Sequence, residues 1–271
     1  MTDRVWTDLP RVTPSSVGDL TGCGKRFAET RILKNWGSNN RDFPESVAHG
    51  TAVHAVLRDV FHDRQGDEVN LTNLGALSRA AVYKGRYPKG FDRERAVERV
   101  MEAVCGYARS QVPEDVAGTI RCEDQIEFPF IWEGRPLCLV SATLDRTLVR
   151  PSENEPGEPG RLVVKEYKTT RPKIDLQEVF IAMFAARHAY PGYASYAMEI
   201  DWIADDGTVS TDTIEGRELR GLHPVIFRAA VRVIHEKQWD ACPSERCIFC
   251  FLRPQCQKMP VVEMREGDEV F

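Results

Sequence analysis

The sequence predicts an α/β protein in which a central mixed β-sheet is flanked by helices. Apolar residues follow helical spacing up to about residue 112, and near residue 118 they change to the alternating pattern of strands. One further helical segment interrupts the strands and another follows them. Strands that alternate with helices in this way are typical of a mixed sheet with helices packed on it.

Helical spacing characterises the N-terminal portion of the chain. The first expected helix follows Ser and Thr residues that can cap its start. In the second, Val53, Val56 and Leu57 belong to one apolar stripe that we expect to be buried. The four helices expected in this portion cover residues 15–34, 43–64, 71–84 and 92–112.

Strand patterns follow this helical portion, and turn signals separate them. We expect a Glu133-Gly134 turn between the first two strands and an Asp206-Gly207 turn between the last two. A segment rich in Pro, Gly and Glu at 151–160 is expected to be a loop. The expected strands cover residues 118–132, 135–150, 161–170, 193–204 and 208–216, with helices at 174–190 and 222–239.

Length and composition predict a single domain, 1–271, within which 13–112 is the helical portion, 118–220 the sheet core and 221–258 the C-terminal helix and cysteine cluster. No apolar run approaches the roughly 20 residues needed to cross a bilayer. The N-terminus has no signal-peptide pattern either, so we expect a cytoplasmic protein without a membrane partner. The net charge of -5 argues against a protein that coats nucleic acid electrostatically.

The cysteines indicate a metal centre, because eight cysteines in the cytoplasm should be reduced thiols and not disulfides. Cys247, Cys250 and Cys256 form a C-x2-C-x5-C pattern, which leaves one thiolate of a four-ligand centre to be found. Cys242 could complete a self-contained zinc site, or it is an incidental thiol. Three others lie among apolar neighbours and are expected to be small core residues: Cys105, Cys122 and Cys138.

Charged residues at strand spacing indicate a catalytic site. Glu166 and Lys168 share one face of the strand at 161–170, and Asp145 lies on the polar face of the preceding strand. Two carboxylates can bring Mg²⁺ or Mn²⁺ to a scissile phosphate, and the ammonium can orient the attacking water. The alternative is a cross-strand salt bridge on a solvated face of the sheet.

The segments SATLDR (141–146) and KEYKTT (165–170) resemble the G-x-x-D-R … D/E-Y-K-T signature of RecB-like nucleases in the PD-(D/E)XK superfamily. That family carries G-x-x-x-H on an upstream helix, and GTAVH supplies Gly50 and His54 here. The resemblance implies a restriction-endonuclease-like core. The residues that it implies as ligands of Mg²⁺ or Mn²⁺ are His54, Asp145, Glu166 and Tyr167 through its backbone carbonyl, and its catalytic set is Asp145, Glu166 and Lys168.

The segment TPSSVGDLTGCGKRF (13–27) is similar to the S-x-S-x-L-x-x-x-x-x-C-P-x-R-F segment of iron–sulfur members of this family, such as AddB-type and CRISPR-associated exonucleases. In those proteins one N-terminal cysteine joins a C-terminal C-x2-C-x5-C. The resemblance therefore implies a [4Fe–4S] cluster bound by Cys23, Cys247, Cys250 and Cys256, which would tie the first helix to the C-terminal segment. Gly24 stands where the family usually has proline.

Residues beside the signature are expected to contact DNA. The phosphate contacts that we predict are Arg146, Thr169 and Arg171. The family often shows Q-x-x-x-Y on the next helix, where this chain has Phe180 and Phe184. Gln177 lies one turn earlier and is the DNA contact that we expect to substitute for that motif. Glu123 and Glu127 could add a carboxylate, although alternating charge on an exposed strand also explains them.

The resemblance implies a metal-dependent DNA exonuclease that acts on single-stranded DNA or on DNA ends, in recombination and repair, phage DNA metabolism or CRISPR adaptation. Because the chain lacks a G-x-x-x-x-G-K-[ST] motif, it would act alone or with a helicase, recombination or CRISPR adaptation partner. Two alternatives stay open at this point. One is a catalytically silent DNA-binding subunit of the same fold, and the other is a zinc-binding interaction module.

Overall fold

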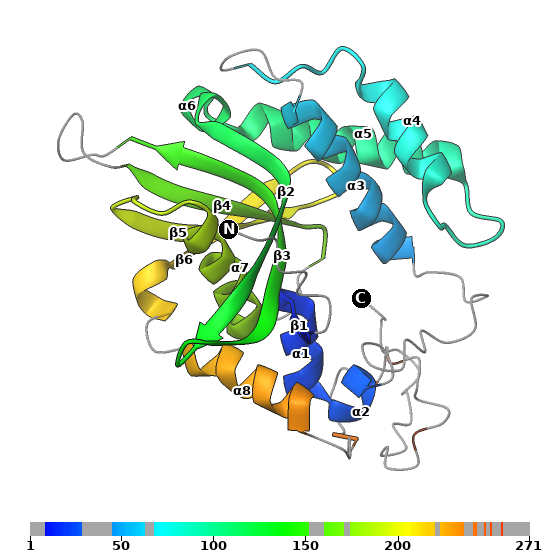
Figure 1. Ribbon diagram of the computed structural model, residues 1–271. Helices are drawn as coiled ribbons and strands as arrows, with labels where there is room; N and C mark the ends of the chain where they lie inside the picture. The colour runs from blue at the N-terminus through cyan, green and yellow to red at the C-terminus, as the bar shows by residue number, and fades with distance from the viewer. Residues whose placement is uncertain are drawn as a thin grey trace.

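A mixed β-sheet lies between two groups of helices, with α3, α4 and α5 on one side and α1, α7 and α8 on the other (Figure 1). The structure is a computed structural model that describes residues 9–28, 45–62, 68–151, 160–170, 174–219 and 223–235, and Ala241, Cys242, Cys247, Cys250 and Cys256. In chain order the elements are β1 (Arg11–Val12), α1 (Pro14–Gly22), α2 (Gly24–Phe27), α3 (Glu45–His62), α4 (Leu74–Lys84), α5 (Arg93–Ser110), α6 (Pro113–Ala117), β2 (Thr119–Trp132), β3 (Arg135–Arg150), β4 (Arg161–Lys168), α7 (Leu176–Ala189), β5 (Ser195–Ile203), β6 (Val209–Glu215), a 3₁₀ turn (Gly216–Leu219) and α8 (His223–His235).

The strand order is β1-β3-β4-β5-β6, with β2 paired to β3 as well. The pairs β2–β3, β3–β4 and β5–β6 are antiparallel, whereas β1–β3 and β4–β5 are parallel. Parallel neighbours need a crossover, and α7 provides it between β4 and β5. The predicted mixed sheet is therefore confirmed.

The two predicted turns are confirmed. Glu133 (φ 49°) and Gly134 (φ 76°) both have positive φ, as expected for the type I′ turn that suits the twist of a two-residue hairpin. Gly207 has φ 77° in the turn between β5 and β6. Glycine tolerates this conformation because it has no Cβ.

The expected long helices agree with α3, α4, α5, α7 and α8, apart from a few terminal residues, and positions 236–239 of the last one lie outside the described residues. The single helix expected at 15–34 is wrong. A reciprocal cap between Thr13 and Ser16 starts α1, but Cys23 is extended (φ -163°, ψ 110°) and separates it from α2. Glycines on both sides of Cys23 disfavour a continuous helix there. Positions 29–34 of that prediction lie outside the described residues.

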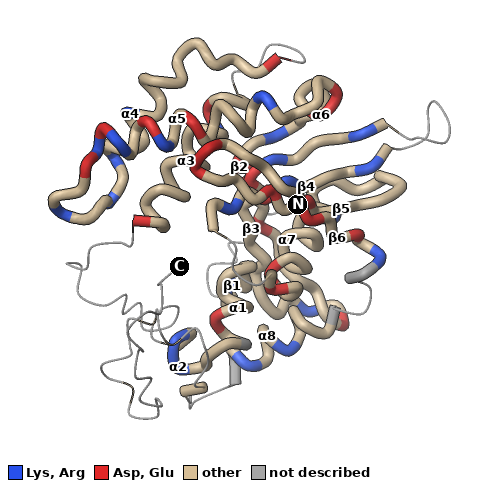
Figure 2. The backbone as a smooth tube through the Cα atoms, turned by 180° about the vertical axis from the view of Figure 1, so that it is seen from behind, with Lys and Arg blue, Asp and Glu red and all other residues tan. Residues whose placement is uncertain are grey.

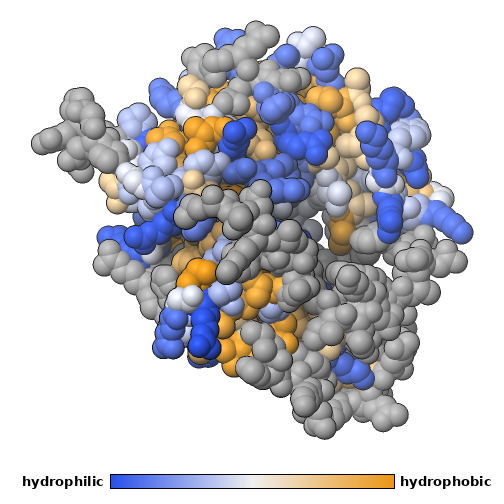
Figure 3. Space-filling view, viewed as in Figure 1, coloured by the Kyte–Doolittle hydropathy of each residue, from blue (hydrophilic) through white to orange (hydrophobic). Residues whose placement is uncertain are grey.

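The sheet separates two apolar cores. One joins it to α1, α7 and α8, as Val17, Ile181 and Ile226 show, and the other joins it to α3, α4 and α5. Helical and strand spacing place these side chains inward, and basic and acidic residues are interspersed along α4 and α5 (Figure 2). Hydrophilic side chains cover much of the surface over these helices (Figure 3). Among the described residues, no helix is both long and apolar enough to cross a membrane.

A close backbone contact fixes α5 against the β5–β6 turn, and it can be tested. A Cβ on Gly106 would lie 2.5 Å from the Gly207 Cα and 2.7 Å from its carbonyl oxygen. Backbone cannot move aside cheaply, so we expect Gly106→Ala to lower the free energy of unfolding by about 1–3 kcal/mol. Urea unfolding monitored by circular dichroism measures this change.

Gly75 in α4 is the matched control, because a Cβ there would meet only the Met101 side chain, at 3.8 Å. Gly75→Ala should leave stability unchanged or raise it by up to about 1 kcal/mol, since alanine is the better helix former. Equal effects of the two substitutions would contradict the proposed backbone contact.

Candidate functional site

The candidate site lies where β3 separates from β4. The two strands pair from Arg150–Arg161 to Arg146–Lys165, and the ladder ends there. The backbone N–H of Tyr167, two residues further along β4, donates instead to Asp145 Oδ2 at 2.8 Å. A buried N–H needs a partner, and the carboxylate takes the place of the missing strand. This bond fixes Asp145 beside β4.

His54 approaches the same point from α3. Its Nε2 lies 2.8 Å from the carbonyl oxygen of Tyr167, and its Nδ1 lies 3.3 Å from Asp145 Oδ1. Gly50 permits this approach, because a Cβ there would lie 2.9 Å from Thr169 Oγ1. Burial lowers the pKa of His54, but the Asp145 and Glu166 carboxylates together outweigh it and raise the pKa to about 9.

Glu166 and Lys168 lie on one face of β4, as the strand period predicts. The Lys168 Nζ donates to Glu166 Oε1 at 2.6 Å. Burial and the neighbouring Asp145 carboxylate both raise the pKa of Glu166. Burial lowers the pKa of Lys168, but Glu166, Asp145 and Glu178 together raise it by more, so the ammonium form is favoured. The structure thus brings Asp145, Glu166, Lys168, His54 and the Tyr167 backbone together.

Glu123 on β2 also lies at this site, so of the two β2 glutamates that could add a carboxylate, it is the one that approaches Asp145. Among the residues that the structure describes, the side chains of His54, Glu123 and Asp145 form the one group of three metal-binding side chains within 4.8 Å of one another. Burial and the Asp145 carboxylate raise the pKa of Glu123. Its backbone has φ 50°, which strand periodicity cannot reveal.

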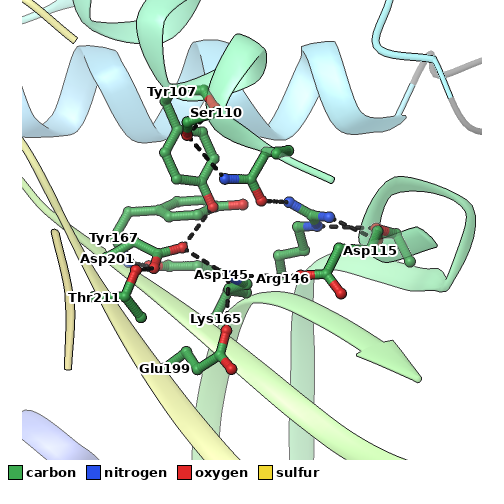
Figure 4. Close-up of polar contacts among 12 residues, drawn as sticks. Tyr107, Ser110, Asp115, Asp145, Arg146, Lys165, Tyr167, Glu199, Asp201 and Thr211 are labelled. Atoms are coloured by element: carbon green, nitrogen blue, oxygen red, sulfur yellow. Dashed lines mark hydrogen bonds and ion pairs between the residues drawn. The ribbon is translucent and has the colours of Figure 1, made fainter. Parts of the chain in front are cut away.

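The structure corrects the prediction for Arg146, whose side chain is fully buried and cannot contact a phosphate. Its guanidinium donates to Thr119 Oγ1 at 2.9 Å, to Gln111 Oε1 at 3.0 Å and to the Asp115 carbonyl at 2.7 Å (Figure 4). It also lies 4.0 Å from the centroid of the Phe61 ring. Arg146 therefore connects β3 to α6 and to the helical layer.

The other predicted DNA contacts have different environments. Thr169 and Gln177 are half-buried, Thr169 lies close to Gly50 on α3, and Arg171 lies outside the described residues. Phe180 is buried, and Phe184 packs against Phe128 with ring centroids 5.7 Å apart. The two positions where the family often has Q-x-x-x-Y thus belong to the apolar core here.

A buried polar network supports Tyr167 from the opposite face of β4 (Figure 4). The Tyr107 hydroxyl donates to Asp201 Oδ2 at 2.7 Å, and the Tyr107 ring meets the Tyr167 ring edge to face with centroids 5.2 Å apart. Asp201 also accepts from Thr211 at 2.6 Å and lies 3.2 Å from the ammonium of Lys165. The ring of Tyr167 is thereby confined while its backbone faces the site.

One contact between described cysteines links the α1–α2 junction to Cys242. Cys23 lies between α1 and α2, and its Sγ accepts the backbone N–H of Cys242 at 3.5 Å. The Cys250 N–H donates to the Cys247 carbonyl at 3.1 Å, which forms a turn inside the C-x2-C motif. The core role expected of three other cysteines is confirmed by their contacts with the two apolar cores: Cys105, Cys122 and Cys138.

Comparison with known proteins gives a family and a fold. The sequence model of the PD-(D/E)XK nuclease superfamily matches residues 11–257. No curated protein sequence matches the chain. A crystal structure from Eubacterium rectale, named "Putative exonuclease", has a TM-score of 0.52 at 10% identity and covers 98% of this chain and 95% of its own. The crystal structure of SSO0001 has a TM-score of 0.35 at 11% identity, covering 74% of this chain and 94% of its own.

The correction for Arg146 can be tested by Arg146→Met, which keeps an apolar chain but removes the guanidinium. The acceptors on Thr119, Gln111 and Asp115 would lose their donor. We therefore expect the free energy of unfolding to fall by at least about 2 kcal/mol. Thermal unfolding measures this loss. Arg58→Met is the control, because exposed Arg58 bonds to its neighbour Asp59, and it should change stability by less than about 0.5 kcal/mol. An unchanged melting temperature in Arg146→Met would contradict the supporting role.

Proposed function

The chain belongs to the PD-(D/E)XK nuclease superfamily, and on this basis we propose that it is a metal-dependent DNA exonuclease that hydrolyses phosphodiester bonds. One observation carries the proposal. His54, Asp145 and the Tyr167 carbonyl meet beside the Glu166–Lys168 pair, at the point where β3 leaves β4. A mixed oxygen and nitrogen donor set next to an ammonium suits hydrolysis of a phosphodiester.

The donor atoms fit a divalent cation. Neighbouring ligands of an octahedral Mg²⁺ lie about 3 Å apart, because each is about 2.1 Å from the ion. An imidazole offers one nitrogen to a given ion, and the Nδ1 of His54 lies 3.3 Å from Asp145 Oδ1, a separation of this size, whereas Nε2 of the same ring bonds to the Tyr167 carbonyl at 2.8 Å. We propose that His54, Asp145, Glu166 and the Tyr167 carbonyl bind Mg²⁺ or Mn²⁺, the imidazole favouring Mn²⁺.

The side chains have separate roles in this proposal. A bound cation would act as a Lewis acid that polarises the scissile phosphate and offsets its developing charge. Lys168 orients the attacking water, and Glu166 fixes the ammonium through their 2.6 Å bond. Tyr167 fixes the orientations of Asp145 and His54 through its backbone. Removal of either charged partner therefore disturbs the position of the other.

We propose DNA, as single strands or ends, as the substrate. The name of the Eubacterium rectale protein, which shares the fold, supports an exonuclease. We propose Thr169, Arg171 and Gln177 as phosphate contacts, and Thr169 lies close to Gly50 of the helix that carries His54. Recombination and repair, phage DNA metabolism and CRISPR adaptation are the proposed settings, with a helicase or a recombination or adaptation protein as partner. All of them place the protein in the cytoplasm, where thiols stay reduced.

We also propose that Cys23, Cys247, Cys250 and Cys256 bind a [4Fe–4S] cluster. Each of these thiols is partly buried, whereas Cys242 is exposed. The N–H of Cys242 points at Cys23 Sγ, an arrangement that stabilises a thiolate. The same contact brings the C-terminal segment to Cys23, which favours a shared centre over a self-contained zinc site built on Cys242. Such a centre would join the two ends of the chain.

Asp145→Ala and Lys168→Ala test the catalytic assignment. Loss of a metal ligand or of the water-orienting ammonium should lower the rate of DNA degradation by at least roughly 100-fold, while circular dichroism shows an intact fold. End-labelled linear DNA with Mn²⁺ gives the rate. Lys84→Ala, at an exposed position of α4, should degrade DNA at the wild-type rate. Wild-type turnover in either site variant would refute the assignment.

The cluster is tested by comparing Cys23→Ala with Cys242→Ala after anaerobic purification. Cys23→Ala should lose the iron and the brown colour, because one of four ligands is gone. Cys242→Ala should keep both, because it retains the backbone N–H that donates to Cys23. Iron content per chain is the readout. Full iron in Cys23→Ala and none in Cys242→Ala would reverse the proposed ligand set.

A further inference from the structure

We infer that Glu123 is a further metal-binding residue, and that its carboxylate binds the same divalent cation as His54 and Asp145. This inference rests on the proposed function, because it adds a ligand from β2 to the site formed by α3, β3 and β4. The sequence resemblance assigns no role to this residue. Position, backbone conformation and the absence of a competing partner support it.

The position of Glu123 follows from the strand register. Cys122 pairs with Arg146 and Asp124 pairs with Leu144, so Glu123 lies across from Asp145. Side chains that face each other across antiparallel strands come close enough to share a ligand. Their carboxylates and the His54 ring do so here, because one atom from each lies within 4.8 Å of the others.

Two unfavourable features coincide at Glu123. Like charges directly across a strand pair repel each other, and this pair is shielded from water because Asp145 is buried. Glu123 also has φ 50° in the middle of β2, whereas the other non-glycine residue with positive φ in the described part of the chain, Glu133, lies in a turn. A divalent cation between the two carboxylates would turn their repulsion into attraction.

The carboxylate of Glu123 has no other partner among the described residues. No hydrogen bond or ion pair of its side chain is formed there, and the charged groups that shift its pKa are Asp145, His54 and Arg58. Glu166, in contrast, is bonded to Lys168 at 2.6 Å. Glu127, further along β2, is exposed and paired with Arg11 at 3.1 Å. Glu123 is therefore the carboxylate of β2 that is free to face the cation.

Binding of Mn²⁺ to the full-length protein, freed of divalent cations beforehand and measured by calorimetry without DNA, tests this inference. Glu123→Gln should weaken Mn²⁺ binding at least tenfold and reduce the rise in melting temperature that Mn²⁺ produces. Without metal its melting temperature should equal or exceed that of the wild type, because the repulsion from Asp145 is gone. Glu127→Gln is the matched control and should bind Mn²⁺ as the wild type does.

A second variant guards against misfolding. Glu123→Gly removes the carboxylate and accepts the positive φ without strain, so it should fold and bind Mn²⁺ as weakly as Glu123→Gln. Wild-type Mn²⁺ affinity in both variants, with normal binding and DNA cleavage by the wild type, would overturn the role of Glu123 and leave the proposed function intact. Absence of Mn²⁺ binding and of cleavage in the wild type itself would overturn both.

Discussion

The site depends on one constraint, which is the need to satisfy the backbone of Tyr167 after β3 has left β4. On its other edge β4 stays paired with β5 up to Lys168 and Trp202, so the strand cannot bend away with β3. The N–H of Tyr167 donates to Asp145, and its carbonyl accepts a hydrogen bond from His54. Unpaired buried backbone groups destabilise the fold. The Asp145 carboxylate and the His54 ring are therefore held by backbone hydrogen bonding, the same interaction that pairs the strands of the sheet.

The far face of β4 makes that arrangement rigid. Lys165 lies there with Glu199 at 2.8 Å and Asp201 at 3.2 Å, and Arg150 bonds to both Asp115 and Glu199. Buried charges of this kind contribute little net stability, but removal of one leaves its partner unpaired. A shift of β4 relative to its neighbouring strands would break these hydrogen bonds and ion pairs. It therefore confines Tyr167, whose ring lies among these groups while its backbone faces the site.

Sequence patterns predicted the parts of this site that depend on local spacing. The two-residue period of strands and the D-R … E-Y-K-T resemblance found Asp145, Glu166 and Lys168, and helical spacing placed His54 on α3. Local patterns could not predict the burial of Arg146, because it depends on contacts with α6 and with Phe61, both distant in sequence. The roles of the site residues are still predictions, and so is that of Glu123, whose importance depends on a backbone conformation that no periodicity encodes. Short elements such as β1 and α6 were not predicted, because they contain too few residues to show a hydrophobic period.

The contact between the two ends of the chain has a different physical role from the site. Helix α1 is anchored without it, because Val17 and Leu20 are buried in the core and the Glu178 side chain of α7 lies against Gly18. Arg232 of α8 also bonds to the Leu20 carbonyl at 3.3 Å. With α1 fixed by packing, Cys23 is presented at a rigid helix end, and the C-terminal cysteines must come to it. A centre formed there would add stability by closing a long loop, whereas the positions of Asp145 and His54 follow from the sheet and α3. Catalytic geometry and chain closure are therefore set by separate parts of the fold.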